Sequence, residues 1–295
     1  GTFFAQRSFW GNILVLGASA VVGYVLEEPD GLRFPINIAV LFVLASFFYG
    51  LTSIALSFIH EPPGETKSES VRWIEQIQRG IDLLRTDPHY RLFLMTRLAL
   101  IPADWAGPFY IVYAKNALGI SPRLVGFYIA ARTTAAILSN LLWGRISDRK
   151  GNRQLIRIAN WIGLTIPLTA LGVGLLAAHQ TTLPAWLPYL YTLVFIAYGA
   201  FSAASAIGGM NYLLDIVPSA ERSLYLGFNS TIFGIVRFSA FASGLIVDWV
   251  GYRAVILVGA CFFALSLILS YTLADSRTIR SDAIKRRVIQ EETPS

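Results

Sequence analysis

The fold of this protein is set by long uncharged stretches such as residues 35–59, which read PINIAVLFVLASFFYGLTSIALSFI. A run of about 20 apolar residues is long enough to cross a bilayer as a single helix. Seven other stretches are also long and mainly apolar, and the complete set of predicted spans is 9–27, 35–59, 92–114, 122–143, 155–178, 186–214, 223–249 and 252–274. The alternating segments of a membrane β-barrel are absent from the sequence. The sequence therefore predicts an all-α polytopic membrane protein with about eight spans.

The composition excludes several other classes of protein. Charged residues make up only 14% of the 295 residues, compared with about 25% in soluble domains. A net charge of +6 would suit a nucleic-acid partner, but the basic residues lie at the edges of apolar runs, which is typical of membrane topology. The single cysteine, Cys261, excludes an internal disulfide and a cysteine-rich metal site. No signal peptide is expected at Gly1.

The basic residues also predict the orientation of the spans. When the N-terminus is placed in the cytoplasm, 18 of the 24 lysines and arginines fall in cytoplasmic segments. Only Arg33, Lys115, Arg123 and Arg253 fall outside, and the remaining two, Arg132 and Arg237, lie within spans. Because an excess of basic residues marks the cytoplasmic loops of a membrane protein, both termini are predicted to be cytoplasmic. Arg97 counts as cytoplasmic in this assignment.

Residues 60–91 interrupt the pattern, because they are too polar to span a membrane. Thr66 and Glu69 have the spacing of a helix capping box. Behind them, apolar residues recur at helical spacing between charged ones, and this apolar set is Val71, Ile74, Ile77, Ile81 and Leu84. The pattern predicts a short amphipathic helix that lies on the membrane surface or covers a cytoplasmic junction, with a regulatory partner site as the alternative.

Three ionisable residues, Asp104, Arg132 and Arg237, lie near the middle of predicted spans. At a rise of about 1.5 Å per residue, each is roughly 15–20 Å from the cytoplasmic end of its helix. Inserting each costs roughly 2.5–3.5 kcal/mol, so such residues are usually paired or face a polar cavity. Helical spacing places Asn140 on the side of Arg132 and Asn229 near that of Arg237.

These five residues form the predicted substrate-binding or coupling site, in which the arginines hold an anion and Asp104 pairs with them or exchanges a proton. Pro102 and Pro108 are expected to bend the helix near Asp104. The alternative is a static ion pair between Asp104 and one arginine that only fixes helix packing. In span 186–214, Gly208 and Gly209 are expected to serve close helix packing, with a gating bend as the alternative.

The most specific motif reads GRISDRKGNR at residues 144–153. It resembles the G-x-L-[AS]-D-[RK]-x-G-[RN]-[RK] loop of the major facilitator superfamily, with Ile146 in place of the usual leucine. In that family the motif joins helices two and three, and a degenerate copy joins helices eight and nine. The position of this loop among the last six spans makes it similar to the second copy. The resemblance covers the whole chain in the order of its spans, but in specific residues it covers only this loop.

The resemblance implies that the spans correspond to helices five to twelve, so that four N-terminal helices of the same chain are missing from this sequence. The implied organisation is 1–59 for the last two helices of the N-terminal half, 60–91 for a cytoplasmic linker, 92–274 for the six-helix C-terminal half and 275–295 for a cytoplasmic tail. Residues 144–153 are then a conformational-switch loop, with Asp148 capping or pairing with the start of helix five near Arg7. The other expected members are Gly144, Arg149, Gly151 and Arg153, the two glycines permitting a tight turn. A merely solvated basic loop is the alternative.

The resemblance further implies secondary active transport of a small solute by alternating access. Helices seven, eight and eleven border the central cavity in the family, and they match the spans that carry Asp104, Arg132 and Arg237. The expected substrate is anionic or polar, with proton coupling, no cofactor, no metal and no nucleic acid, in a bacterial inner membrane. A non-transporting receptor or scaffold on the same fold is the alternative.

The absence of several sequence motifs excludes further classes of function. The sequence lacks G-x-x-x-x-G-K-[ST], H-E-x-x-H and G-x-S-x-G, so neither an ATP-driven pump nor an enzyme is predicted. The Gly-Pro pattern that marks drug–proton antiporters on helix five is not met by Gly11, Gly17 and Gly23, which disfavours drug efflux.

Overall fold

The computed structural model describes residues 35–58, 73–218 and 221–275, together with Leu32, Arg33 and most of residues 11–25. All regular structure in these ranges is helical. The chain divides into two compact units, Gly1–Trp73 with Ser121–Ala130 and Ile74–Ile120 with Ala131–Ser295. The first unit contains the uncharged helix α2 (Ile36–Ser57), and the second contains Asp104, Arg132 and Arg237.

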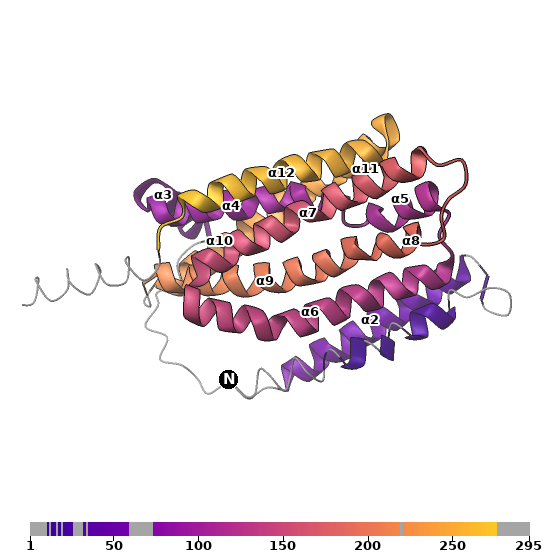
Figure 1. Ribbon diagram of the computed structural model, residues 1–295. Coiled ribbons are helices and arrows are strands. Elements are labelled where there is room, and N and C mark those ends of the chain that lie inside the picture. Colours follow the sequence, from indigo (N-terminus) through magenta and orange to yellow (C-terminus); the bar gives the residue numbers. More distant parts are fainter. Residues whose placement is uncertain are drawn as a thin grey trace, which may run out of the picture. The chain divides into compact units, whose positions relative to one another are not determined.

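The other helices follow one another along the chain as shorter and longer rods (Figure 1). They are α3 (Trp73–Thr86), α4 (Pro88–Ala103), the 3-10 helix η1 (Asp104–Ala106), α5 (Phe109–Leu118), α6 (Pro122–Lys150), α7 (Asn152–Ala178), α8 (Leu187–Leu190), α9 (Thr192–Ile216), α10 (Arg222–Arg237), the 3-10 helix η3 (Phe238–Ala240), α11 (Phe241–Val250) and α12 (Tyr252–Thr272). The prediction of an all-α fold is confirmed for the described residues.

Among the residues that the structure describes, six helical stretches are long and apolar enough to cross a membrane: Ile36–Ser57, Arg123–Lys150, Asn152–Ala178, Leu187–Ile216, Arg222–Val250 and Tyr252–Thr272. They correspond to six of the eight predicted spans. A shorter apolar helix, Ile13–Val25, falls in the first predicted span. The remaining span, 92–114, is divided between α4 and α5 at the 3-10 helix η1, between the two prolines that were expected to bend it.

The start of α4 follows from its capping residue. The Oδ1 atom of Asp87 accepts hydrogen bonds from the backbone N–H groups of His89 and Tyr90, both at 3.0 Å. Pro88 occupies the first helical position, where a missing N–H costs nothing. The helix therefore begins before the predicted span, and Arg97 lies about two and a half turns inside it.

The break between α4 and α5 lies between Pro102 and Pro108. Pro108 has no N–H to donate to Asp104, so the α-helical hydrogen bonding cannot continue there. The N–H of Gly107 instead donates to the carbonyl of Asp104 at 2.9 Å, which is the tighter 3-10 pattern. Asp104 is consequently placed at an interruption in the middle of the predicted span.

A second interruption follows Arg237, the last residue of α10. The hydroxyls of Ser239 and Ser243 donate to the backbone carbonyls of Val236 and Ala240. Such hydrogen bonds compete with the helical pattern and often bend a helix. They accompany the 3-10 turn η3, so Arg237 also lies at a change of helix type.

Close helix packing around α7 forms the core of the second unit. Helix α7 packs against α9 and α12, and α12 packs against α4. Glycines allow these approaches, since a Cβ on Gly163 would lie 2.5 Å from the ring of Phe263 and one on Gly259 would lie 3.0 Å from the carbonyl of Ala103. Small residues at contacts are the usual means by which membrane helices associate.

The glycine pair of α9 also serves packing in this structure. Helix α9 continues without a break through Gly208 and Gly209. A Cβ on Gly208 would lie 3.2 Å from Leu155, and one on Gly209 would lie 2.8 Å from the guanidinium carbon of Arg97. The two glycines therefore face different neighbours, a core leucine of α7 and a charged residue of α4.

The predicted amphipathic helix is present as α3. Gly80 is buried against the ring of Phe228 on α10, and Leu83 and Leu84 pack against a buried apolar cluster at this end of the second unit. Ile77 and Ile81, in contrast, are 37% and 41% exposed. Of the predicted apolar stripe, Leu84 therefore packs against the cluster, whereas Ile77 and Ile81 are exposed. Thr66 and Glu69 lie outside the described residues.

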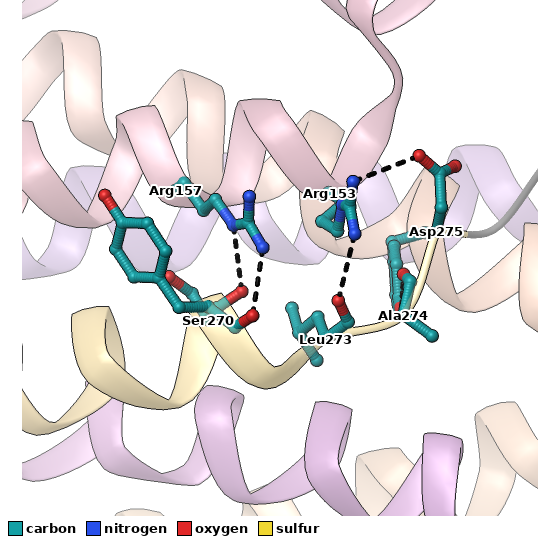
Figure 2. A network of polar contacts seen from close by, with 8 residues as sticks. Arg153, Arg157, Ser270, Leu273, Ala274 and Asp275 are labelled. Carbon is teal, nitrogen blue, oxygen red and sulfur yellow. Dashed lines mark hydrogen bonds and ion pairs between the residues drawn. The ribbon is translucent and has the colours of Figure 1, made fainter.

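The last turn of α12 is held by two arginines near the start of α7 (Figure 2). Arg157 donates from Nε to the carbonyl of Ser270 at 3.2 Å and from Nη2 to that of Tyr271 at 3.0 Å. Arg153 forms an ion pair with Asp275, with 3.2 Å between Nη2 and Oδ2. Because the last carbonyls of a helix lack partners within the helix, these contacts satisfy groups that would otherwise be unpaired.

We expect Arg157→Leu to destabilise the protein by about 1–3 kcal/mol, because two hydrogen bonds from a charged donor are lost. Thermal unfolding of the detergent-solubilised protein measures the change. Arg145→Leu, at an exposed position of α6, is the control and should have little effect. Equal unfolding temperatures for the two variants would contradict the prediction.

Candidate functional site

Asp104, Tyr198 and Arg132 are joined by direct contacts. The hydroxyl of Tyr198, on α9, donates a hydrogen bond to Oδ1 of Asp104 in η1. The guanidinium of Arg132, on α6, lies over the same tyrosine ring, with Cζ 4.1 Å from the ring centroid. A cation in this position is attracted by the electrons of the ring. One tyrosine therefore contacts both the acid and one arginine.

Arg237 is the third member of the group predicted from the sequence. Helix α4 packs against α10 and η3, the elements on either side of Arg237. Asp104 interacts electrostatically with both Arg132 and Arg237. Among the described residues, neither arginine places a nitrogen within 4.0 Å of the carboxylate. The direct contact of Asp104 is with Tyr198, and the two arginines act on it from a longer distance.

Two of these residues lie at the helix interruptions. Asp104 begins η1, and Arg237 ends α10. Irregular backbone at membrane depth is tolerated where it is buried in protein or lines a cavity, and transporters often bind substrates at such discontinuous helices. Within the described part of the chain, the side chains of Asp104, Arg132 and Arg237 are all exposed.

The backbones of α6 and α9 touch beside Tyr198. A Cβ on Gly199 would overlap the carbonyl oxygen of Arg132 and would lie 3.1 Å from the backbone nitrogen of Ala136. Farther along the same pair of helices, the indole N–H of Trp143 donates to the carbonyl of Ala200 at 3.1 Å. The absence of a side chain at Gly199 therefore lets the ring of Tyr198 reach Arg132.

Arg97 is a functional candidate that the sequence analysis missed. Its Nη1 atom donates to the backbone carbonyl of Ser205 at 3.1 Å and to the Ser205 hydroxyl at 2.6 Å. It also interacts electrostatically with Arg237. The signal that could have revealed it is the Asp87–Pro88 start of α4, which places Arg97 well inside the helix.

Two polar cross-links join α4 and η1 to α9 in one antiparallel register. Arg97 pairs with Ser205, and Asp104 pairs with Tyr198. Each partner in the second pair is seven residues from its counterpart in the first, which is about two helical turns or 10 Å. Tyr198 was also absent from the predicted site, because its contacts depend on this register.

The two predicted asparagines do not join the group directly. Asn140 and Asn229 are each eight residues from Arg132 and Arg237, about 12 Å along their helices. Among the described residues neither forms a hydrogen bond with Asp104 or the arginines. The Oδ1 atom of Asn229 is buried without a partner in this part of the chain.

The predicted switch loop differs from expectation in its backbone. Helix α6 continues to Lys150, so Gly144 and Asp148 are helical and the predicted turn at Gly144 was wrong. The chain turns only at Gly151, whose φ of +85° favours glycine. Arg153 lies in α7 and pairs with Asp275. The expected partner region near Arg7 lies outside the described residues, and Asp148 and Arg149 are exposed at the end of α6.

The chemistry available in this group is proton exchange and the binding of charge. It contains one carboxylate, three guanidiniums and a tyrosine hydroxyl. In the described ranges there is no cluster of three or more His, Cys, Asp or Glu that would hold a metal ion. An excess of guanidinium over carboxylate favours an anionic ligand, because arginine binds carboxylate and phosphate groups through paired donors.

These features define a polytopic helical membrane protein with a polar group between its spans. The family model for the Major Facilitator Superfamily matches residues 92–291. Because this match covers more than half of the chain, the protein belongs to the Major Facilitator Superfamily, as the motif at residues 144–153 indicated.

Two relatives are similar over a shorter range. Both are multi-drug resistance efflux pumps named PmrA, from two strains of Streptococcus pneumoniae. Each is 27% identical over 172 residues, which cover 55% of this chain and 39% of the relative. The aligned region therefore spans well under half the length of these relatives.

Proposed function

We propose that the protein is a secondary active transporter that moves a small anionic or polar solute by alternating access, coupled to protons. The observation that carries the proposal is the contact of Asp104 with Tyr198, near Arg132 and Arg237 at two helix interruptions. Asp104 is the protonatable group, and the two arginines bind the solute. Membership of a transporter family supports this assignment.

The cellular setting is part of the same proposal. The distribution of basic residues favours cytoplasmic termini in a bacterial inner membrane, and the bacterial relatives support that location. By the position of the motif in the family, the spans correspond to helices five to twelve, and residues 60–91 link the two halves. Transport then depends on the preceding helices of the same protein, which supply the other side of the cavity.

Drug export is the second candidate function, because the named relatives are multi-drug resistance efflux pumps. The three guanidiniums argue for anionic compounds over lipophilic cations. A receptor on the same fold is the alternative from a different class, and it would bind the solute without moving it.

Flux measurements on the full-length protein test the proposal. Proteoliposomes should accumulate a labelled small anion when a pH gradient is imposed, and a protonophore should abolish the accumulation. A lipophilic cation dye, assayed in parallel, measures the drug-export alternative. Binding of solute with flux equal to that of protein-free vesicles would favour the receptor and overturn the transport proposal.

Tyr198 offers a more specific test of the site. We expect Tyr198→Phe to lower proton-driven flux about tenfold, the equivalent of about 1.4 kcal/mol, because it removes the hydroxyl that donates to Asp104 and keeps the ring below Arg132. Tyr198→Leu removes both contacts and should reduce flux further. Flux in proteoliposomes at matched protein content measures both variants. Wild-type flux in Tyr198→Phe would show that the hydrogen bond has no part in coupling.

A further inference from the structure

The guanidinium of Arg97 has unused hydrogen-bonding capacity. Among the described residues, Arg97 donates through Nη1 alone, to two acceptors that are both on Ser205. In the described part of the chain, Nε and Nη2 of Arg97 donate to no acceptor and no carboxylate lies within 4.0 Å. Ser205 holds one edge of the guanidinium, so that its remaining donors are left for another partner.

A second cation acts on this arginine. Arg97 and Arg237 repel each other electrostatically, and α4 packs against α10 and η3 on both sides of Arg237. Two like charges in a membrane interior are unfavourable unless an opposite charge lies between them. Asp104 is about two turns farther along and is already bound by Tyr198.

We infer that Arg97 and Arg237 form a subsite for the anionic group of the substrate, either a carboxylate or a phosphate. The inference rests on the proposed function and deepens it. The acidic group of the substrate would bind between Arg97 and Arg237, and the rest of the substrate would lie near Asp104 and Arg132, about two helical turns farther along. Arg237 interacts with both Arg97 and Asp104. An anion at this subsite therefore offsets the repulsion between the arginines and lies within the electrostatic influence of the protonatable acid.

Gly209 gives the subsite its shape. A Cβ at this position would lie 2.8 Å from Cζ and 3.0 Å from Nε of Arg97, so any side chain would push the guanidinium aside. The neighbouring Gly208 faces Leu155 of α7 instead. The two glycines therefore provide a matched pair of variants in the same turn of α9, of which only one changes the position of Arg97.

The test measures anion binding to the full-length purified protein by calorimetry, with inorganic phosphate and succinate as probes and glucose as the neutral control. Wild-type protein should bind at least one of the two anions and no glucose. Arg97→Gln and Arg237→Gln should weaken that binding at least tenfold, and Arg97→Lys should retain part of it. Gly209→Ala should weaken it several-fold, whereas Gly208→Ala should bind as the wild type does.

The outcomes separate this inference from the proposed function. Unchanged anion binding in Arg97→Gln, or equal binding by the two alanine variants, would overturn the subsite. A wild type that moves the cation dye in vesicles and binds neither anion would also overturn it, while transport itself would stand. If Arg97→Gln does not fold, the comparison of Gly209→Ala with Gly208→Ala decides the question.

Discussion

Asp104→Asn should uncouple transport from the pH gradient: proton-driven accumulation of solute falls at least tenfold, while exchange of solute across the membrane continues. Asparagine is close to the protonated acid in shape, but it cannot release a proton. The groups that face Asp104 are Tyr198 from α9, Arg132 from α6, Arg237 from α10 and Tyr110 from α5. In the ionised state the two arginines and the tyrosine hydroxyl stabilise the carboxylate, so proton uptake has to weaken these interactions.

The measurement is accumulation and exchange in proteoliposomes at several external pH values. Asp82→Asn is the control, since Asp82 lies exposed on α3 next to Arg85 and should keep the wild-type pH profile. If Asp104→Asn accumulates solute with the wild-type dependence on pH, Asp104 is not the residue that binds the coupled proton. Loss of exchange together with accumulation would point to a structural role.

Gly199→Leu should have the largest effect on stability. Even a Cβ at this position overlaps the carbonyl oxygen of Arg132, so the larger side chain forces α6 away from α9. Inserting atoms into a packed interior costs about 1–3 kcal/mol and sometimes more. The same displacement moves Arg132 off the ring of Tyr198, so solute binding should fall together with the unfolding temperature.

Gly172→Leu is the matched control, because Gly172 is a helical glycine of α7 and a Cβ at this position would have no neighbouring atom within 4 Å. It should leave stability unchanged or raise it slightly, by up to about 1 kcal/mol, since leucine is the better helix former. Thermal unfolding in detergent compares the two variants. Equal unfolding temperatures of the two variants would contradict the close backbone contact between Gly199 of α9 and Arg132 of α6.

Six of the predicted membrane helices are found among the described residues, because apolar stretches of this length have one stable arrangement in lipid. Asp104, Arg132 and Arg237 stood out in the sequence because ionisable residues are rare in such stretches, and their role stays a prediction. Arg97 falls near the start of the predicted span, which begins at residue 92, and for that reason it counts as cytoplasmic in the sequence analysis. The capping by Asp87 that starts α4 earlier is a local signal that hydropathy does not detect.

The pairing of side chains between helices could not be predicted. The contacts of Tyr198 and Ser205 depend on how far α9 is shifted along α4, and many shifts bury the same apolar surface. The turn at Gly144 was predicted wrongly for a related reason. Glycine permits a turn and does not require one, and at the end of α6 only Gly151 adopts a positive φ.

The paired cross-links of Arg97 with Ser205 and Asp104 with Tyr198 restrict how these helices can move. Sliding α4 along α9 by one turn, about 5.4 Å, would break both pairs at once. The two pairs therefore favour a fixed register between these helices. The backbone beside Arg237 is interrupted between α10 and α11, so under the proposed mechanism we expect a bend at this point. If an anion drew Arg237 toward Arg97, we would expect α10 and α11 to bend at this interruption while α4 and α9 keep their register.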